Sequence, residues 1–256
     1  MSSLFINQHE VLKNVELIIF DKDGTLIDIH HYWSSMIGIR AREIVNKWFN
    51  DADAAQHEAN LMTLMGVDLS TSRLKPEGPV GVKSRGHIVD LVRDYVGQQA
   101  QPVTHDDVEL LFQSVDQMTE QNLQPLLKPL PGVERLLVDI KASGTNAVIA
   151  STDITSRTVK AMQALQLDAF FSHIVGGDAV KHTKPAPDLA QLVIEKVGVS
   201  PSKVAVIGDH PVDILMGMGA GIEVNIGVLN GISQQQSFAD YSCQTVDNLQ
   251  AIQIRE

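Results

Sequence analysis

Two aspartates separated by one residue follow a short apolar run near the start of the chain. The run ends at Phe20, and the acids are Asp21 and Asp23, with Gly24 next. Consecutive apolar residues are typical of a strand buried on both faces of a parallel sheet, and burying carboxylates at its end is costly unless a cation meets them. A strand followed by an ordinary Asp-Gly turn explains Gly24 but not both acids. The pattern therefore indicates a metal-dependent phosphoryl-transfer site with one Asp as nucleophile and the other as acid and base.

A second group of polar residues follows the predicted strand Ala147–Ala150. Ser151, Thr152 and Asp153 come directly after it and just before a predicted helix. A hydroxyl and backbone N–H groups at such a junction bind anions, although the same residue types are also ordinary helix caps. We expect Ser151 to bind phosphate and Thr152 or Asp153 to cap the helix.

A lysine lies in the loop after the predicted strand His173–Val175. Lys184 precedes Pro185, which holds its backbone extended, and a helix is predicted from Pro187. A lone lysine is usually a solvated surface charge. Here clustered acids and a phosphate dianion need a cation, so we expect Lys184 to meet them.

A second pair of acids follows the predicted strand Lys203–Ile207. Asp209 comes after Gly208, and Asp213 lies one helical turn later. Oxygen ligands at this spacing suit Mg²⁺, whereas Asp209 alone is also explained as an acid at a helix N-terminus. Ligands of open α/β sheets bind beyond the carboxyl ends of the strands, so we expect all of these residues to meet at one edge.

These motifs, in this order, resemble those of the haloacid dehalogenase-like hydrolases. The first motif is Asp21-Lys22-Asp23-Gly24-Thr25-Leu26, and the others are Ser151, Lys184-Pro185 and Gly208-Asp209-x-x-x-Asp213. The resemblance points to the phosphoglycolate phosphatase and β-phosphoglucomutase-like branch, which has a helical cap. It implies a Rossmann-like core, Mg²⁺ and an aspartyl-phosphate intermediate.

The same resemblance implies a role for each matching residue. Asp21 is the implied nucleophile and Asp23 the implied acid and base. The implied phosphate-binding residues are Ser151, Thr152 and Lys184, of which Ser151 and Lys184 also count as catalytic. The implied Mg²⁺ ligands are the Asp21 side chain, the Asp23 backbone carbonyl and the Asp209 side chain, with Asp213 in support.

One residue of the first motif departs from the family's commonest version. Lys22 stands between the two acids, as in the transport ATPases, but those have Thr at the position of Asp23 and this chain has no apolar run long enough to span a membrane. An acid at position 23 also disfavours dehalogenases and phosphonate hydrolases. Lys22 bears on the pKa of the acid and base, not on the reaction class.

The alternation of strands and helices predicts an α/β fold with a doubly wound, mostly parallel sheet. Residues 1–28 and 127–256 are expected to form the catalytic core, and 29–126 a helical cap inserted after the first strand. That interval is too long for an ordinary crossover, and its pattern is mostly helical. Further predicted elements are strands Glu16–Phe20 and Val224–Val228, helices Tyr32–Phe49, Gly86–Val96, Asp106–Glu120, Val133–Ala142, Thr155–Leu167 and Pro187–Val197, and a loop over Gly66–Lys83.

Composition narrows the function classes. The chain of 256 residues carries 20 Lys and Arg against 31 Asp and Glu, a formal net charge of −11, which argues against nucleic acid as a partner. The single cysteine, Cys243, agrees with a reducing cytoplasm. The first residues do not resemble a secretory signal, so we expect a cytoplasmic protein without a membrane partner.

The expected function is Mg²⁺-dependent hydrolysis of a phosphate monoester of a small metabolite. A sugar phosphomutase shares the same core residues and remains an alternative, as does a catalytically silent binding domain. The residues do not identify the ester or indicate the oligomeric state.

Overall fold

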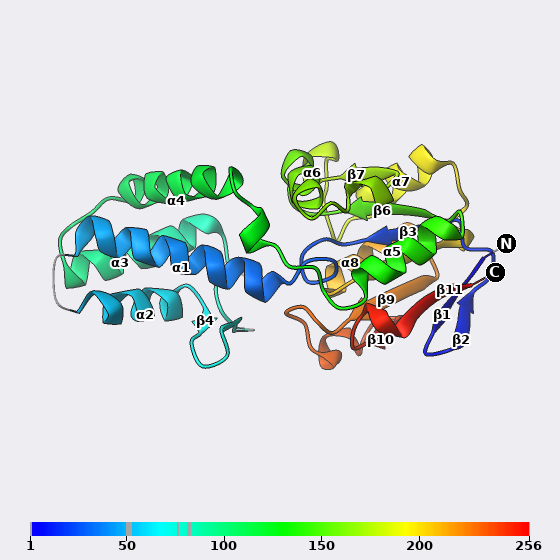
Figure 1. Ribbon diagram of the computed structural model, residues 1–256, viewed down its shortest axis with the longest axis horizontal. Helices are drawn as coiled ribbons and strands as arrows, with labels where there is room; N and C mark the ends of the chain where they lie inside the picture. The colour runs from blue at the N-terminus through cyan, green and yellow to red at the C-terminus, as the bar shows by residue number, and fades with distance from the viewer. Residues whose placement is uncertain (1, 50–52, 76, 81–82, 256) are drawn as a thin grey trace. The chain divides into compact units, whose positions relative to one another are not determined.

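A computed structural model describes residues 2–49, 53–75, 77–80 and 83–255 (Figure 1). The chain divides into two compact units. One is formed by the residues up to Ile29 together with those from Leu127 onward, and the other by His30–Leu126.

The first unit is built on a six-stranded sheet in which every pairing is parallel. The strand order is β10-β9-β8-β3-β6-β7. The predicted doubly wound α/β fold is confirmed, and the five predicted strands are all present, with ends shifted by one residue at most. The strands are β3 (Leu17–Phe20), β6 (Asn146–Ala150), β7 (His173–Val175), β8 (Val204–Gly208), β9 (Val224–Val228) and β10 (Gln244–Val246).

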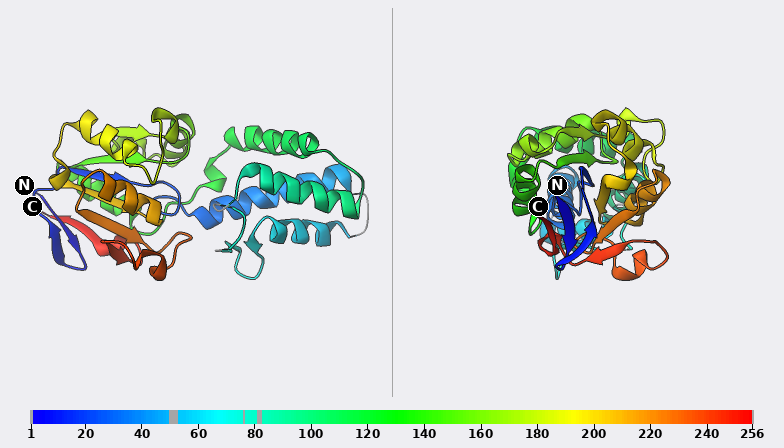
Figure 2. Two further views of the ribbon diagram at one scale, coloured as in Figure 1. Left: turned by 180° about the vertical axis from the view of Figure 1, so that it is seen from behind. Right: turned by 90° about the vertical axis from the view of Figure 1, so that its right-hand side faces the viewer.

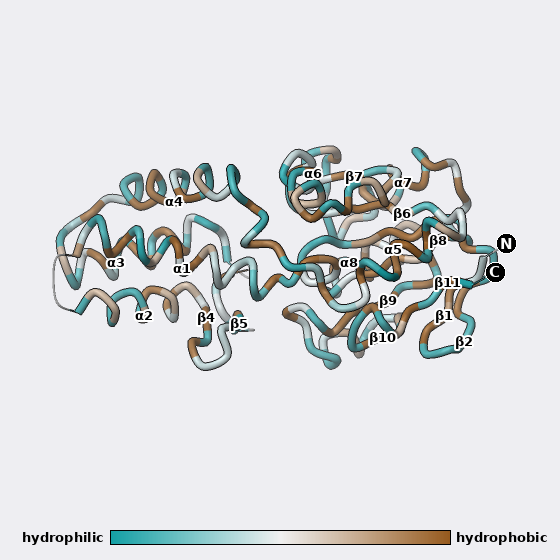
Figure 3. Tube along the Cα trace, in the orientation of Figure 1, coloured by the Kyte–Doolittle hydropathy of each residue, from teal (hydrophilic) through white to brown (hydrophobic). Residues whose placement is uncertain are grey.

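Strand β3 lies in the middle of this sheet, and its side chains are buried on both faces. Leu17 and Ile19 point to one face, where they join a core with residues of α7 (Asp188–Val197) and α8 (Pro211–Gly219). Ile18 and Phe20 point to the other face and are also fully buried. The strands are accordingly hydrophobic along most of their length (Figure 3). In β3, the change to polar residues comes directly after the strand, at Asp21.

Two other helices of this unit are α5 (Val133–Ala142), which matches its prediction, and α6 (Thr155–Ala164). Helix α6 ends three residues before the predicted Leu167, because Gln166 adopts a left-handed conformation with φ 58°. The predicted cap by Thr152 or Asp153 is wrong. The N-cap is Ile154, without a side-chain bond, and the Thr155 N–H donates to Asp178 Oδ1 at 2.7 Å.

Gly217 lies inside α8, where the helix packs on the sheet. A Cβ at this position would lie 2.0 Å from Asn225 Oδ1 of β9. The glycine therefore lets the helix approach the sheet closely.

A three-stranded antiparallel sheet, absent from the predicted elements, joins the two ends of the chain. It consists of β1 (Ser3–Ile6), β2 (His9–Leu12) and β11 (Ile252–Arg255), with β1 in the middle. Strand β1 pairs with β11 over all four residues, which brings the marked chain ends together (Figure 2). Four-residue strands give a weak local signal, and this pairing spans almost the whole sequence.

The second unit is mainly helical. Helix α1 (Ile29–Trp48) buries a stripe that includes Ile37, Ile44, Val45 and Trp48. The other helices are α2 (Ala54–Leu64), which was not predicted, α3 (Arg85–Gln99) and α4 (His105–Glu120). The predicted loop Gly66–Lys83 contains a short antiparallel pair, β4 (Val67–Asp68) and β5 (Arg73–Leu74), and its residues 76, 81 and 82 lie outside the described residues.

Short 3-10 helices complete the list of elements: Gln124–Leu126, Asp168–Phe170, Gly177–Ala179, Pro201–Lys203, Gln235–Phe238 and Leu249–Ala251. Among the described residues, no helix has both the length and the apolar character needed to cross a membrane.

Candidate active site

The site begins at the carboxyl end of β3. Phe20 is in register with Ile149 of β6 and Ile207 of β8, and the Asp21 N–H donates to the Ile207 carbonyl at 2.9 Å. Because the three strands are parallel, the loops that follow them leave the same edge of the sheet. Residues far apart in sequence therefore meet beside Asp21.

Three acids and one lysine form a buried cluster at this edge. One carboxylate oxygen each from Asp21, Asp209 and Asp213 lies within 4.8 Å of the others. Lys184 Nζ lies 2.6 Å from Asp21 Oδ1 and 2.6 Å from Asp213 Oδ1, and its side chain is 1% exposed. These four predicted site residues are thus brought together by the fold.

Burial and charge shift the titration of this cluster. Burial raises the pKa of Asp21, and Lys184 offsets only part of this effect. Burial and the nearby Asp21 raise the pKa of Asp209 well above its ordinary value. Burial would lower the pKa of Lys184, but Asp21 and Asp213 outweigh it and raise that pKa, so the lysine stays charged.

The cluster fits a divalent cation. Three carboxylates face one ammonium group, so the acids carry more negative charge than Lys184 neutralises. Oxygen donors in small number are the ligands that Mg²⁺ takes in proteins. Asp21 and Asp209 would hold the ion, while Asp213 is engaged by Lys184 and by the His210 N–H, which donates to its Oδ2 at 3.1 Å.

Glycines make room for two of the acids. A Cβ on Gly24 would lie 2.2 Å from Asp209 Oδ2, and one on Gly231 would lie 1.7 Å from the same atom. Gly24 also needs its φ of +86° to turn the chain after β3. A Cβ on Gly208 would lie 2.3 Å from Asp213 Oδ2. The glycine of each motif is therefore required by the neighbouring carboxylate.

The second acid of the first motif points to a different partner. Asp23 Oδ2 lies 3.0 Å from Lys22 Nζ, which also lies 2.8 Å from Asp153 Oδ2. Burial raises the pKa of Asp23, although Lys22 opposes this. Asp23 is thus tied to the loop after β6.

Ser151 opens that loop and is 1% exposed. Its N–H donates to the Val175 carbonyl at 3.0 Å, and its Oγ accepts from the Asp153 N–H at 3.1 Å. Thr152 is exposed and lies outside the buried cluster formed by the described residues.

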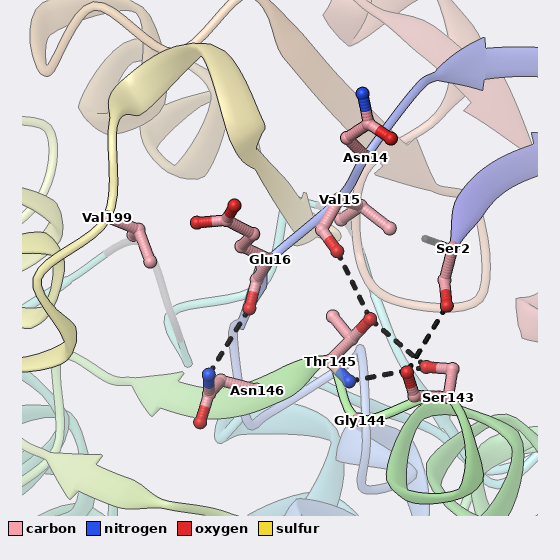
Figure 4. Close-up of a pocket in the computed structure, with 9 residues that line it drawn as sticks. All are labelled: Ser2, Asn14, Val15, Glu16, Ser143, Gly144, Thr145, Asn146 and Val199. Atoms are coloured by element: carbon pink, nitrogen blue, oxygen red, sulfur yellow. Dashed lines mark hydrogen bonds between the residues drawn. The ribbon is translucent and has the colours of Figure 1, made fainter.

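A pocket of about 310 Å³ lies at the other end of the sheet (Figure 4). It is bordered by Glu16, just before β3, and by Asn146, the first residue of β6. Its hydroxyl groups are engaged within the protein: Thr145 Oγ1 donates to the Val15 carbonyl at 3.2 Å, and Ser143 Oγ donates to Thr145 Oγ1 at 3.0 Å. The acids of the buried cluster lie at the opposite edge of the sheet.

The family model described as haloacid dehalogenase-like hydrolase matches residues 15–221. The chain belongs to this family. The match spans the acidic cluster and the loops that form it, and it confirms the family resemblance of the motifs.

Individual relatives agree with this family. A phosphorylated carbohydrates phosphatase of Thermotoga maritima is 28% identical over 53% of this chain and 62% of its own length, which is less than two thirds of that protein. A phosphoglycolate phosphatase of Escherichia coli O157:H7 is 29% identical over 93% of this chain and 92% of its own. A crystal structure from Thermotoga maritima, named as a candidate beta-phosphoglucomutase, has a TM-score of 0.67 at 20% identity and covers 93% of this chain and 96% of that one, which shows the fold alone.

Two residues at the site of this hydrolase were not among the predicted ones. Gly231 abuts Asp209, and the Ile232 N–H donates to Asp209 Oδ2 at 3.3 Å. Both lie in the loop after β9 (Val224–Val228). A glycine and an isoleucine carry no chemical signal of their own, but they follow the predicted strand Val224–Val228 at the edge of the sheet where ligands bind.

Proposed function

We propose that this protein is an Mg²⁺-dependent phosphatase that hydrolyses a phosphate monoester of a small metabolite through an aspartyl-phosphate on Asp21. The observation that carries the proposal is the buried contact of Lys184 with both Asp21 and Asp213, next to Asp209. A carboxylate nucleophile beside a lysine and a cation-binding pair of acids suits phosphoryl transfer. The phosphatase names of the relatives support the same reaction.

In the first step, an oxygen of Asp21 attacks phosphorus while the bond to the leaving oxygen breaks. Asp23 donates a proton to that oxygen, and its raised pKa favours the protonated form that this needs. Lys184 and Ser151 hold the phosphoryl oxygens, with Thr152 beside them. Mg²⁺, held by Asp21, the Asp23 carbonyl and Asp209, would offset negative charge between the carboxylate and the phosphate.

In the second step, Asp23 takes a proton from water as the water oxygen attacks phosphorus. The Asp21–phosphorus bond breaks, and inorganic phosphate leaves with Asp21 restored. In this scheme residues 1–28 and 127–256 are the catalytic core, and 29–126 are the cap that selects the ester. Phosphoglycolate is one candidate ester, after the named activity of a relative. A cytoplasmic location remains a prediction.

The test is turnover of purified protein with p-nitrophenyl phosphate and a panel of small alkyl phosphates, with Mg²⁺ and with chelator. Asp21→Asn should lower kcat at least about 1,000-fold without loss of fold, because the nucleophile is removed. Asp139→Asn, in an exposed ion pair of α5 with Arg135, is the matched control and should keep full activity.

Three results would contradict the proposal. Normal turnover by Asp21→Asn would remove this residue from its role. With a hexose phosphate as substrate, an isomerised sugar phosphate in place of inorganic phosphate would identify a phosphomutase. Failure of the wild type to act on any ester of the panel would leave the silent binding domain.

A further inference from the structure

Lys22 is buried between two loops of the site but is not paired with the nucleophile. Its side chain is 5% exposed, and its Nζ lies 3.0 Å from Asp23 Oδ2 and 2.8 Å from Asp153 Oδ2. We propose that Lys22 is a positioning residue that holds the Asp23 carboxylate against the loop after β6, in the orientation needed for proton transfer. The inference rests on the proposed function, in which Asp23 is the acid and base.

The backbone of Lys22 is itself anchored. Its carbonyl accepts hydrogen bonds from the Leu26 N–H at 2.9 Å and from the Ile27 N–H at 3.0 Å. The side chain therefore extends from a fixed point in the turn after β3. A lysine anchored at its base and paired at its tip has lost most of its freedom of rotation, so it can hold a neighbour in place.

The far end of the bridge is also fixed. Asp153 Oδ1 accepts from the Ile154 N–H at 2.8 Å and from Arg157 Nη1 at 3.1 Å. The Asp153 N–H in turn donates to Ser151 Oγ at 3.1 Å. Lys22 thus connects Asp23 to a carboxylate that already has other partners, next to the residue proposed to bind phosphate.

The two carboxylates depend on Lys22 to different degrees. Asp153 keeps Arg157 and a backbone N–H if Lys22 is removed. Among the described residues, Lys22 is the cation that pairs with Asp23. The loss of Lys22 should therefore release Asp23 while leaving the loop after β6 in place.

Neutralising the acidic cluster does not explain this lysine. Lys184 contacts Asp21 and Asp213, whereas Lys22 is directed to Asp23 and Asp153. The pair of carboxylates that Lys22 contacts is therefore separate from the pair that Lys184 contacts.

A positioning role for Asp23 has a chemical signature in the leaving group. A nitrophenolate leaves without a proton, whereas an alkoxide needs one from the general acid. A displaced Asp23 slows the alkyl ester more than the aryl ester. A residue that only stabilises the fold, or only neutralises charge at the nucleophile, slows both esters alike.

The experiment compares Lys22→Met with wild type on p-nitrophenyl phosphate and on the alkyl phosphate of the panel that the wild type hydrolyses fastest. The measured quantity is kcat/KM, which reports the steps up to loss of the leaving group. Lys22→Met should lower kcat/KM for the alkyl ester at least about 10-fold more than for the aryl ester, since general acid catalysis contributes about 10²- to 10⁴-fold. Lys22→Arg should restore part of the loss.

Two further variants complete the test. Lys203→Met, which removes a lysine paired with Glu16 outside the site, is the matched control and should leave both rates unchanged. In an Asp23→Asn background, Lys22→Met should no longer change the ratio of the two rates, because the acid that it positions is gone.

The outcomes distinguish failure of the positioning role of Lys22 from failure of the proposed phosphatase function. Equal loss on both esters by a folded Lys22→Met, or no loss, overturns the positioning role and leaves the phosphatase intact. Wild-type protein without turnover on either ester overturns the proposed function and the positioning role with it. Circular dichroism and the unfolding temperature establish that each variant is folded.

Discussion

At the scale of single residues, the site depends on glycines, whose lack of a side chain leaves room for a carboxylate. Gly24 and Gly231 both abut the Asp209 carboxylate, from the loops after β3 and β9. A side chain at either position would occupy the space of Asp209 Oδ2. The carboxylate proposed to bind Mg²⁺ is therefore oriented by two backbone segments.

Gly231→Ala should weaken Mg²⁺ binding about 10- to 100-fold, as is usual when the support of a metal ligand is lost. The added Cβ would lie 1.7 Å from Asp209 Oδ2 and must displace it. Titration calorimetry with Mg²⁺ measures the effect. The control is Gly97→Ala in the exposed part of α3, where a Cβ meets nothing within 4 Å. Unchanged affinity in Gly231→Ala would show that Asp209 is not held by this contact.

At the scale of elements, a charged group joins three helices of the second unit. Arg40 of α1 is buried, with its guanidinium 4.4 Å from the centre of the Phe112 ring and its Nη2 2.7 Å from Asp116 Oδ1 of α4. Arg85 of α3 lies 2.6 Å from Asp116 Oδ2. Asp116 thus bridges two arginines from separate helices. An apolar stripe on α1 predicts its packing, but a buried arginine within that stripe requires a specific partner.

Asp116→Asn should lower the free energy of unfolding by about 2 kcal/mol at pH 7, because buried Arg40 loses its counter-charge. Burial would raise the pKa of Asp116, but Arg40 and Arg85 outweigh it and lower that pKa. A lowered pKa stabilises the fold above the ordinary carboxylate pKa of about 3.9, and the gain is lost as the pH falls below it. The cost of Asp116→Asn should therefore shrink below about pH 4.

Urea unfolding followed by tryptophan fluorescence measures this cost, since both tryptophans of the chain, Trp33 and Trp48, lie in α1. Asp94→Asn, which alters an exposed pair with Arg93, should change stability little at any pH. A cost for Asp116→Asn that persists unchanged at pH 3 would rule out its ionic origin.

At the scale of the whole molecule, one unit is inserted into the other at a single place. The Asp28 N–H donates to the Lys128 carbonyl at 2.8 Å, and the Leu130 N–H donates to the Leu26 carbonyl at 3.0 Å. The chain therefore leaves and re-enters the first unit along adjacent, hydrogen-bonded segments. Such adjacent ends are typical of places where domains are inserted.

Replacing His30–Leu126 with a short Gly/Ser linker should leave a folded first unit that binds Mg²⁺ within about 3-fold of wild type, a difference of under 1 kcal/mol. The paired segments hold the two ends close together, so a short linker can join them. The four residues of the buried cluster, Asp21, Lys184, Asp209 and Asp213, all belong to this unit. Circular dichroism and Mg²⁺ calorimetry test this. Loss of the fold, or of Mg²⁺ binding by more than about tenfold, would show that the first unit depends on the second.

Local patterns were enough to predict much of this molecule. An apolar run precedes Asp21, and similar changes from apolar to polar residues occur before Ser151 and Asp209. These changes were sufficient to predict the strands and to identify the site residues that follow them. Parallel strands have one carboxyl edge, so the order of elements already implies that these loops meet. The helices with clear stop signals, such as α7 before Gly198, were equally accessible.

Other features required contacts between distant parts of the chain. The bridge of Lys22 to Asp153 spans 131 residues. The contact of Gly231 with Asp209 joins two loops, and neither loop sequence indicates that it contacts the other. The pairing of β1 with β11 is of the same kind. Backbone propensity and periodicity act over one or two turns, whereas such contacts depend on close packing and buried charge between segments that only the tertiary structure brings together. The residue types of the site could therefore be identified from the sequence alone, whereas the partners that orient them were determined only by the tertiary structure.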